Sequence, residues 1–380
     1  MKKFQNEVVL LFINTLGSGG AQRQIVLLAR ELKSRNLNVV LLHYGESDYM
    51  AYMLEGSGVE IIWLRASGKF QKVLLLWRLV YKILSINPKL AISFIDTPNI
   101  IMGVAKILRR SVVWVSSERN TTSSNDSKEV RWRNFFYRFA HAVVPNSGSQ
   151  LRWLDENIPS ARGKTRLVKN GIAPELFRAP DVDDLLKARQ TFEFLILGRV
   201  GHQKNPQLLL RALKLMDPEL RSRVSFKWYG EEEPTSPGML GLLKSEASEF
   251  GLPVVFSPAI RDTTAALAKA DALLLCSLYE GTPNVVLEAM AASRLVISSD
   301  IADIPSLLGL GERGVLYESD NEQSLLNAIE QVVRMDRVDV VRRVERAYAY
   351  VLGEYSSEKM ASRFLAAAGF EPDGISRDFA

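Results

Sequence analysis

The chain has 380 residues, 47% hydrophobic and 24% charged, which is the composition of a soluble globular protein large enough for two domains. Its single cysteine, Cys276, excludes an internal disulfide framework, and three scattered histidines offer no spacing for a metal site. The net charge of +5 hides an asymmetry. Residues 1–178 carry 26 Lys and Arg against 13 Asp and Glu, whereas residues 179–380 carry 22 against 30. We therefore expect the first half to meet an anionic partner: nucleic acid, an acidic membrane surface or a phosphorylated substrate.

Short apolar runs alternate with amphipathic segments along the chain, which is typical of doubly wound parallel sheets. The first run is short and is read as a buried strand rather than a signal peptide. No run approaches the ~20 apolar residues of a membrane span. In the first half, strands are predicted at residues 8–14, 38–44, 89–96, 111–118 and 140–147. In the second half, they are predicted at residues 192–199, 224–230, 253–259, 270–277, 295–300 and 314–317. Helices are predicted at residues 21–36, 205–216 and 263–270.

The alternation breaks near residues 167–178, where "LVKNGIAPELF" contains a turn cluster of Asn-Gly followed by Pro. We place a linker from there to Lys187 and predict two Rossmann-like domains, residues 1–175 and 176–355. A single large α/β domain is the alternative. In open α/β sheets ligands bind outside the carboxyl ends of the strands, so motifs just after strands are the ones to examine.

The first such motif is "NTLGSGGAQRQ", residues 14–24, which joins a strand to a helix. Glycines let the backbone approach a ligand, and a helix N-terminus attracts phosphate. Gly17 and Gly19 fit G-x-G, but Gln22 stands where a dinucleotide fingerprint has its third glycine. The motif is either an anion site or a tight strand–helix turn.

The second motif is "GRVGHQKNPQLLL", residues 198–210. Arg199 ends a strand and Lys204 follows five residues later, a spacing at which two cations on one loop can clamp a diphosphate. His202 is a weaker candidate for a third contact. The alternative is a solvated basic loop.

The third motif is "YEGTPNVVLEAM", residues 279–290. Pro283 suits the start of a helix, whose first amides would face a phosphate or hydroxyls. Glu280 precedes that helix and Glu288 lies within it, and carboxylates accept hydrogen bonds from vicinal diols such as those of ribose. The alternative is that both glutamates merely cap the helix and face solvent.

Taken together, these stretches resemble the family 4 glycosyltransferases. Glu280 and Glu288, with seven residues between them, are similar to the E-x7-E signature of that family, and "LGRVGHQKNPQLLLRAL" is similar to its Gly-Arg…Lys-Asn loop. The glycine loop and its helix, and the late stretch "EYSSEKMASRFLAAA", also resemble the family. The resemblance implies a GT-B-type architecture: an acceptor-binding and a nucleotide-sugar-binding Rossmann-like domain facing across a cleft. It also implies that residues 356–380 form a tail and a helix that returns to the N-terminal domain.

The resemblance further implies a retaining, metal-independent transfer from a nucleotide-sugar, most simply a UDP-sugar, without a separate cofactor. Arg199 and Lys204 would hold the donor diphosphate, with amides of Gly19 and Gly20 adding to them. Glu288 would hold the ribose, and Glu280 the donor sugar. Donor contacts are also expected near the start of the helix and in the segment that meets the base: Gly281, Thr282, Asn284, Val285 and Ile260.

Many relatives carry a histidine near the reacting carbon, after a strand of the N-terminal domain, and this chain has none there. Asp96 in "SFIDTPN" and Glu118 in "VSSERN" stand at strand ends instead. Either would position the acceptor hydroxyl, or simply cap the following helix.

Residues 61–95 contain six cations and no acid, interleaved with apolar and aromatic residues. The cations are Arg65, Lys69, Lys72, Arg78, Lys82 and Lys89. This pattern suits a helix in a membrane interface, although a buried Rossmann helix with solvated lysines explains it as well.

The interfacial reading predicts a saccharide acceptor linked to a lipid such as undecaprenyl pyrophosphate. It also predicts an enzyme on the cytoplasmic face of an anionic membrane, acting in surface polysaccharide or lipid-linked oligosaccharide synthesis. A sugar-nucleotide epimerase or phosphorylase on the same fold is one alternative, but it would need more acid–base residues. A nucleic-acid-binding protein is the other. The basic residues interleave with aliphatic runs rather than stacking aromatics, which argues against nucleic acid as a partner.

Overall fold

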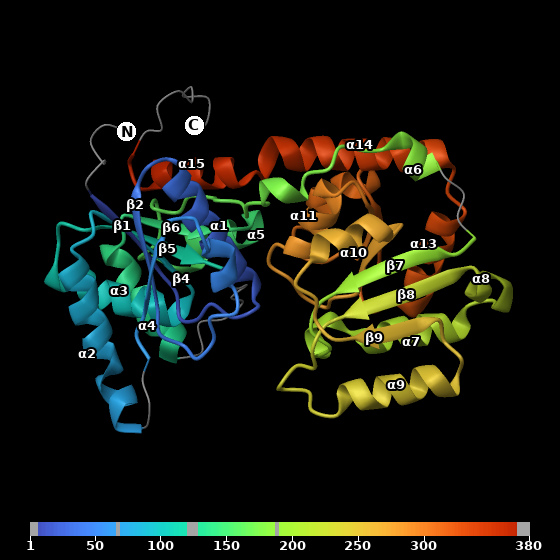
Figure 1. Cartoon of the computed structure of the whole chain (residues 1–380), viewed down its shortest axis with the longest axis horizontal. Helices are drawn as coiled ribbons and strands as arrows, with labels where there is room; N and C mark the ends of the chain where they lie inside the picture. The colour runs from blue at the N-terminus through green and yellow to red at the C-terminus, as the bar shows by residue number, and fades with distance from the viewer. Residues whose placement is uncertain (1–6, 66–68, 120–127, 187–189, 371–380) are drawn as a thin grey trace. The chain divides into compact units, whose positions relative to one another are not determined.

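The computed structural model describes residues 7–65, 69–119, 128–186 and 190–370, and the chain divides into two compact units. Unit 1 comprises the described residues up to Gly171 and the segment from Tyr355 onward; unit 2 runs from Ile172 to Glu354. Each unit contains a parallel six-stranded sheet flanked by helices (Figure 1). The predicted α/β class with two Rossmann-like domains is confirmed. Among the described residues, no helix has the length and apolar character needed to cross a bilayer.

The unit 1 sheet has the strand order β3-β2-β1-β4-β5-β6. Its strands are β1 (Val8–Phe12), β2 (Asn38–His43), β3 (Glu60–Trp63), β4 (Leu90–Phe94), β5 (Val113–Glu118) and β6 (Ala142–Pro145). Its α-helices are α1 (Gly20–Ser34), α2 (Lys69–Ile86), α3 (Asp96–Leu108), α4 (Lys128–Phe136), α5 (Gly148–Asn157) and α15 (Ser357–Ala367). Short 3-10 turns occupy Ala51–Leu54 and Tyr137–Phe139.

Strand β3 was not predicted from the sequence. It has four residues, lies at the sheet edge beside β2, and is exposed or half-buried along its length. A short edge strand buries little, and its apolar run, residues 61–64, is shorter than the predicted runs of the central strands.

The last helix of unit 1 lies beside the first, as the red and blue ends of the colour scale show (Figure 1). Arg35, which ends α1, donates to Ser362 Oγ at 3.0 Å and to the Glu358 carbonyl at 2.7 Å. Phe364 stacks on Phe94 of β4 with ring centroids 5.7 Å apart. The expected return of the C-terminal helix to the N-terminal domain is therefore present as direct contacts.

The unit 2 sheet has the order β12-β11-β10-β7-β8-β9, so its chain path repeats that of unit 1. Its strands are β7 (Phe192–Leu197), β8 (Val224–Tyr229), β9 (Val254–Ser257), β10 (Ala272–Leu275), β11 (Leu295–Ser299) and β12 (Val315–Tyr317). Its α-helices are α6 (Val182–Leu186), α7 (Pro206–Leu215), α8 (Pro218–Ser222), α9 (Met239–Glu249), α10 (Thr263–Lys269), α11 (Asn284–Ala291), α12 (Ile304–Leu307), α13 (Glu322–Val333) and α14 (Arg337–Glu354). Its 3-10 turns occupy Pro174–Leu176, His202–Lys204 and Gly309–Gly311. The 3-10 turn Pro174–Leu176 and helix α6 fall in the predicted linker. The last residue of that linker, Lys187, lies outside the described residues.

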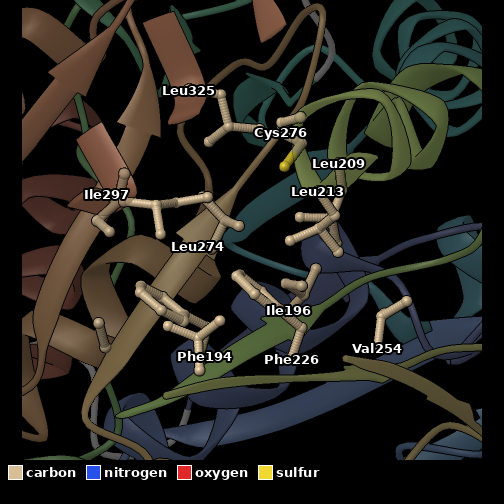
Figure 2. Packing of buried hydrophobic residues seen from close by; sticks show 14 of the residues in the cluster. Phe194, Ile196, Leu209, Leu213, Phe226, Val254, Leu274, Cys276, Ile297 and Leu325 are labelled. Atoms are coloured by element: carbon tan, nitrogen blue, oxygen red, sulfur yellow. The ribbon is translucent and has the colours of Figure 1, made fainter. Parts of the chain in front are cut away.

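Large apolar side chains fill the space between the unit 2 sheet and its helices (Figure 2). Phe194 and Phe226 stack across β7 and β8 with centroids 4.7 Å apart. Leu209 and Leu213 of α7 are fully buried in the same core. Fully burying a side chain of this size contributes about 1.5–3 kcal/mol, so this core fixes β7 and α7 firmly enough to hold the loop between them. Burial raises the pKa of the Cys276 thiol to about 12.

In both units the strand order reverses at the centre of the sheet, between β1 and β4 in unit 1 and between β7 and β10 in unit 2. The loops after these neighbouring strands separate there, which leaves a crevice suited to ligands at the carboxyl ends. The sequence motifs follow these four strands.

Candidate active site

In unit 2, the loops after β7 and β10 are tied together at the point where the strand order reverses. The Gln203 side chain donates to the Tyr279 carbonyl at 3.0 Å, and the Leu278 amide donates to the Gln203 carbonyl at 2.9 Å. Because β7 and β10 are parallel neighbours, both loops leave the same edge of the sheet. The second and third sequence motifs therefore form one polar surface.

An ion pair lies at the centre of this surface. Lys204 Nζ is 2.5 Å from Glu280 Oε1, and the Ser277 hydroxyl donates to the same oxygen at 2.7 Å. The two charged side chains are only 20% and 10% exposed. The structure thus joins two residues that the sequence assigned to different parts of the donor.

Arg199 is the more accessible cation of the loop after β7. Its side chain is 61% exposed, and its one ion pair within the described residues is a loose one, 3.5 Å to Glu233. An exposed pair at that distance contributes little to stability, so Arg199 can turn to an incoming anion at low cost. His202, the weaker candidate, is exposed at the start of a 3-10 turn.

Glu288 is almost fully buried, with 3% of its surface exposed. Thr263, the first residue of α10, lies 3.5 Å from Glu288 Oε2 through its hydroxyl. Ile260, which was predicted to meet the base, is half-buried three residues earlier in the same loop. The structure therefore brings the loop after β9 to Glu288, and no sequence motif had indicated Thr263.

The remaining predicted donor contacts surround the first turn of α11. Gly281, Thr282, Asn284 and Val285 are all half-buried. Pro283 is the N-cap, and its side chain makes no hydrogen bond to the helix. The helix start thus has the partial positive charge that favours an anion or an oxygen ligand.

In unit 1, the glycine loop and Asp96 follow the two central strands. Gly19 is the N-cap of α1 and has no side chain to cap the helix, and Gly20 is the first helical residue. Asp96 opens α3 directly after Ile95, whose φ of 66° is rare for a β-branched residue. Such strain costs about 1–3 kcal/mol and persists where the surrounding structure fixes it. The backbone at Ile95 thus determines where the Asp96 carboxylate is presented.

Asp96 and Glu118, the two acids considered for the acceptor side, share one cation. Arg133 Nη1 lies 2.6 Å from Asp96 Oδ1 and 2.8 Å from Glu118 Oε2. The Tyr137 hydroxyl donates to the other carboxylate oxygen, Glu118 Oε1, and the Asn99 amide nitrogen lies 3.4 Å from that oxygen. The exposed fractions separate the two acids: 26% of the Asp96 side chain is exposed against 1% for Glu118.

Burial raises the pKa of Glu118, and the Arg133 charge opposes that rise. Burial and the neighbouring Glu118 also raise the pKa of Tyr137 well above its usual value, so its hydroxyl stays protonated and donates. Glu118 therefore acts inside the domain as the partner of Arg133. Asp96 is the more exposed acid of the pair, and it lies in the first turn of α3 rather than at its N-cap.

Sequence reasoning missed Arg133 and Tyr137. Both stand in "RWRNFFYRF", where one buried arginine cannot be told from its solvated neighbours. Only the approach of α4 to α3 makes the role of Arg133 visible. Within the described ranges, no three His, Cys, Asp or Glu side chains are grouped closely enough to hold a metal ion.

Comparison with solved structures defines the class of protein. The crystal structure of Anabaena Alr3699/HepE in complex with UDP and glucose superposes with a TM-score of 0.82 at 17% sequence identity, covering 96% of this chain and all of that one. WaaG, a glycosyltransferase involved in lipopolysaccharide biosynthesis, gives a TM-score of 0.69 at 15% identity, covering 97% of this chain and 100% of that chain. The fold is that of the GT-B glycosyltransferases.

Sequence comparison gives the family. Residues 18–176 match the model of Glycosyltransferase Family 4, and residues 191–335 match that of Glycosyl transferases group 1. A Campylobacter jejuni enzyme, GalNAc-alpha-(1->4)-GalNAc-alpha-(1->3)-diNAcBac-PP-undecaprenol alpha-1,4-N-acetyl-D-galactosaminyltransferase, is 26% identical over 337 residues, which span 86% of this chain and 88% of that enzyme. The chain belongs to the family 4 glycosyltransferases, and the predicted resemblance is confirmed.

Proposed function

We propose that this glycosyltransferase moves a sugar from a UDP-sugar to a lipid-linked saccharide with retention of anomeric configuration and without an essential metal. The observation that carries the proposal is the joining of Lys204 and Glu280 where the unit 2 strand order reverses, with Glu288 buried in the helix that follows Glu280. The UDP-bound HepE structure and the undecaprenol-linked substrate named for the Campylobacter enzyme support the two substrate classes.

The donor diphosphate would be held by Arg199 and Lys204. Arg199 is exposed and weakly paired, so it is the cation available for first contact. Lys204 is already held by Glu280, and it would share its ammonium group between that carboxylate and a phosphate oxygen. Two positive charges match the two negative charges of a diphosphate diester and offset the charge that develops as the sugar–phosphate bond breaks.

Glu288 would accept hydrogen bonds from the ribose hydroxyls, and Glu280 from a hydroxyl of the donor sugar. Ile260 would contact the base. The half-buried residues at the start of α11 would contribute amides to the sugar or the phosphate: Gly281, Thr282, Asn284 and Val285.

Retention follows from the groups assigned to the reaction. Asp96 would orient the acceptor hydroxyl, and the leaving diphosphate would take its proton on the face from which it departs. No strong protein base is then required. In unit 1, the amides of Gly19 and Gly20 at the start of α1 would bind an anionic group of the substrate.

Helix α2 supports an acceptor that is linked to a membrane lipid. Leu74, Trp77 and Tyr81 are exposed, with 60% of Trp77 and 74% of Tyr81 accessible, whereas Leu79 and Ile83 on the other face are buried. Apolar and aromatic residues at this helical spacing, with Arg78 and Lys82 among them, suit the headgroup region of an anionic membrane. The side chains of Lys69 and Lys72, also assigned to this surface, lie outside the described residues.

The enzyme would thus work at the cytoplasmic face of a membrane, where both a UDP-sugar and an undecaprenyl-pyrophosphate-linked saccharide are available. Neither alternative is favoured, because both sequence models and the fold are those of glycosyltransferases.

A panel of sugar nucleotides incubated with membrane-extracted lipid-linked saccharides tests the proposal. We expect UDP release that depends on both substrates and persists in excess EDTA, with an α-linked product from an α-linked donor by NMR. Release that needs no acceptor would favour the epimerase or phosphorylase alternative. No release with any donor would refute the proposal.

A further inference from the structure

A cavity of about 450 Å³ opens at the amino end of the unit 2 sheet, the edge opposite the Lys204–Glu280 pair. Its walls are the turn Leu310–Glu312, the start of β12 at Gly314–Leu316, and one face of α14. Because all six strands are parallel, their amino ends lie at this edge and their carboxyl ends at the other. The cavity is therefore not part of the proposed donor site.

Three arginines of α14 line the cavity: Arg342, Arg343 and Arg346. We call this feature the arginine pocket. Glu312 is the only acid among its lining residues, so the lining carries an excess of positive charge. The volume is in the range of small-ligand sites and accommodates a phosphate or a diphosphate.

Within the described residues, Nη1 of the Arg343 guanidinium is hydrogen-bonded and Nε is not. Its Nη1 donates to the Gly311 carbonyl and, at 2.9 Å, to the Gly314 carbonyl. Its Nε is buried and has no hydrogen-bond partner among the described residues. A buried donor without an acceptor is costly, and in native proteins it usually marks a bound water or ion. A guanidinium fixed by two carbonyls is also pre-organised to bind an oxyanion.

The other two arginines flank this group, and each is exposed and has one carboxylate partner. Arg346 is 52% exposed, and its ion pair with Glu312 spans 3.7 Å. Arg342 is 55% exposed and pairs with Asp339 one turn earlier in the same helix. Arg342 and Arg346 stand four residues apart, a spacing at which like charges destabilise a helix. A bound anion would offset that repulsion.

We propose that the arginine pocket binds the oxyanion of a phosphate group. Arg343, fixed by its two carbonyl bonds, contributes positive charge to the wall of the pocket, and Arg342 and Arg346 contact the anion from the helix face. Bidentate arginine–phosphate contacts are strong and directional, so three guanidiniums give the pocket a preference for phosphate over singly charged anions. The phosphate is either free, as inorganic phosphate or diphosphate, or part of a lipid headgroup.

Titration of the full chain with inorganic pyrophosphate, followed by calorimetry, tests the proposal. Arg342→Gln/Arg346→Gln removes two exposed side chains and should leave the fold intact, while weakening pyrophosphate binding by about tenfold or more. Arg343→Lys keeps the positive charge but loses the planar guanidinium with its several N–H donors, and it should weaken binding as well. The matched control is Lys244→Gln/Arg223→Gln, which removes two exposed cations of unit 2 that do not line the cavity.

Pyrophosphate also fits the proposed donor site, and Arg199→Ala reports that site separately. Flotation with phosphatidylglycerol vesicles, against phosphatidylcholine vesicles, reports a headgroup as the source of the phosphate. Loss of pyrophosphate or vesicle binding in Arg342→Gln/Arg346→Gln, but not in the control pair, supports the pocket and identifies the source. Equal binding of both probes by wild type and by Arg342→Gln/Arg346→Gln overturns it, whatever Arg199→Ala shows.

Discussion

Replacing Arg133 by Met is expected to destabilise unit 1 strongly, because it removes the ion-pair partner of a buried carboxylate. The Arg133 side chain is fully buried, and Glu118 beside it is 1% exposed. Breaking a buried ion pair by removing one partner typically costs about 3–5 kcal/mol. Asp96 is 26% exposed, so water partly replaces Arg133 there, and Asp96→Asn should cost no more than about 1 kcal/mol.

The loss should depend on pH with a definite sign. Burial already raises the pKa of Glu118, and without Arg133 it rises further. A carboxyl with a raised folded pKa retains its stability below its unfolded value, near 4.3, and loses it as the pH rises through the folded value. The free-energy difference between wild type and Arg133→Met should therefore be smaller at pH 5 than at pH 7.5.

Urea unfolding at both pH values, with hydrogen exchange of the β4 and β5 amides as a reading local to unit 1, measures this effect. Glu118→Gln/Arg133→Met provides the control, because a neutral amide no longer needs the cation and most of the lost stability should return. A loss below about 1 kcal/mol in Arg133→Met, or a double variant no more stable than the single one, would refute the buried-pair reasoning.

Three other predictions concern different parts of the chain. His43 is fully buried, and burial lowers its pKa to about 4, so the unfolded chain binds more protons between pH 6.5 and 4. Stability should thus fall by about 2 kcal/mol between neutral pH and pH 5 in a way that His43→Leu abolishes; parallel pH profiles would contradict this. Glu288→Ala should weaken nucleotide binding and Lys204→Ala should chiefly slow turnover, measured as Kd and kcat for the same donor; equal losses of both parameters in both variants would disprove the division of roles. Trp77→Ala/Tyr81→Ala should reduce flotation with phosphatidylglycerol vesicles while leaving UDP binding unchanged, and undiminished flotation would argue against α2 as the membrane-facing helix.

The sequence predicted the central strands well, because their apolar runs are continuous. β1, β4, β7 and β10 are each buried on both faces of a parallel sheet, which leaves a clear signal in the residues. The prediction from the sequence missed β3, a four-residue edge strand that buries little surface. The observed strand ends also fall short of the predicted ranges by a few residues.

For the candidate site, the sequence predicted which loops matter but not which side chains meet. Lys204 and Glu280 are 76 residues apart, and their contact depends on β7 and β10 being neighbours in the sheet. Arg133 is one of several arginines in α4 and its vicinity, and only the packing of that helix shows that it lies between two acids. The choice between Asp96 and Glu118 likewise needed their exposed fractions, which no local pattern encodes.

A crystal structure of the protein soaked with UDP or a UDP-sugar tests the central claim most directly. We expect both phosphates within hydrogen-bond distance of Arg199 and Lys204, and the ribose hydroxyls on Glu288. Nucleotide density elsewhere on the molecule, with the Lys204–Glu280 pair undisturbed and Glu288 without a ribose, would contradict the account.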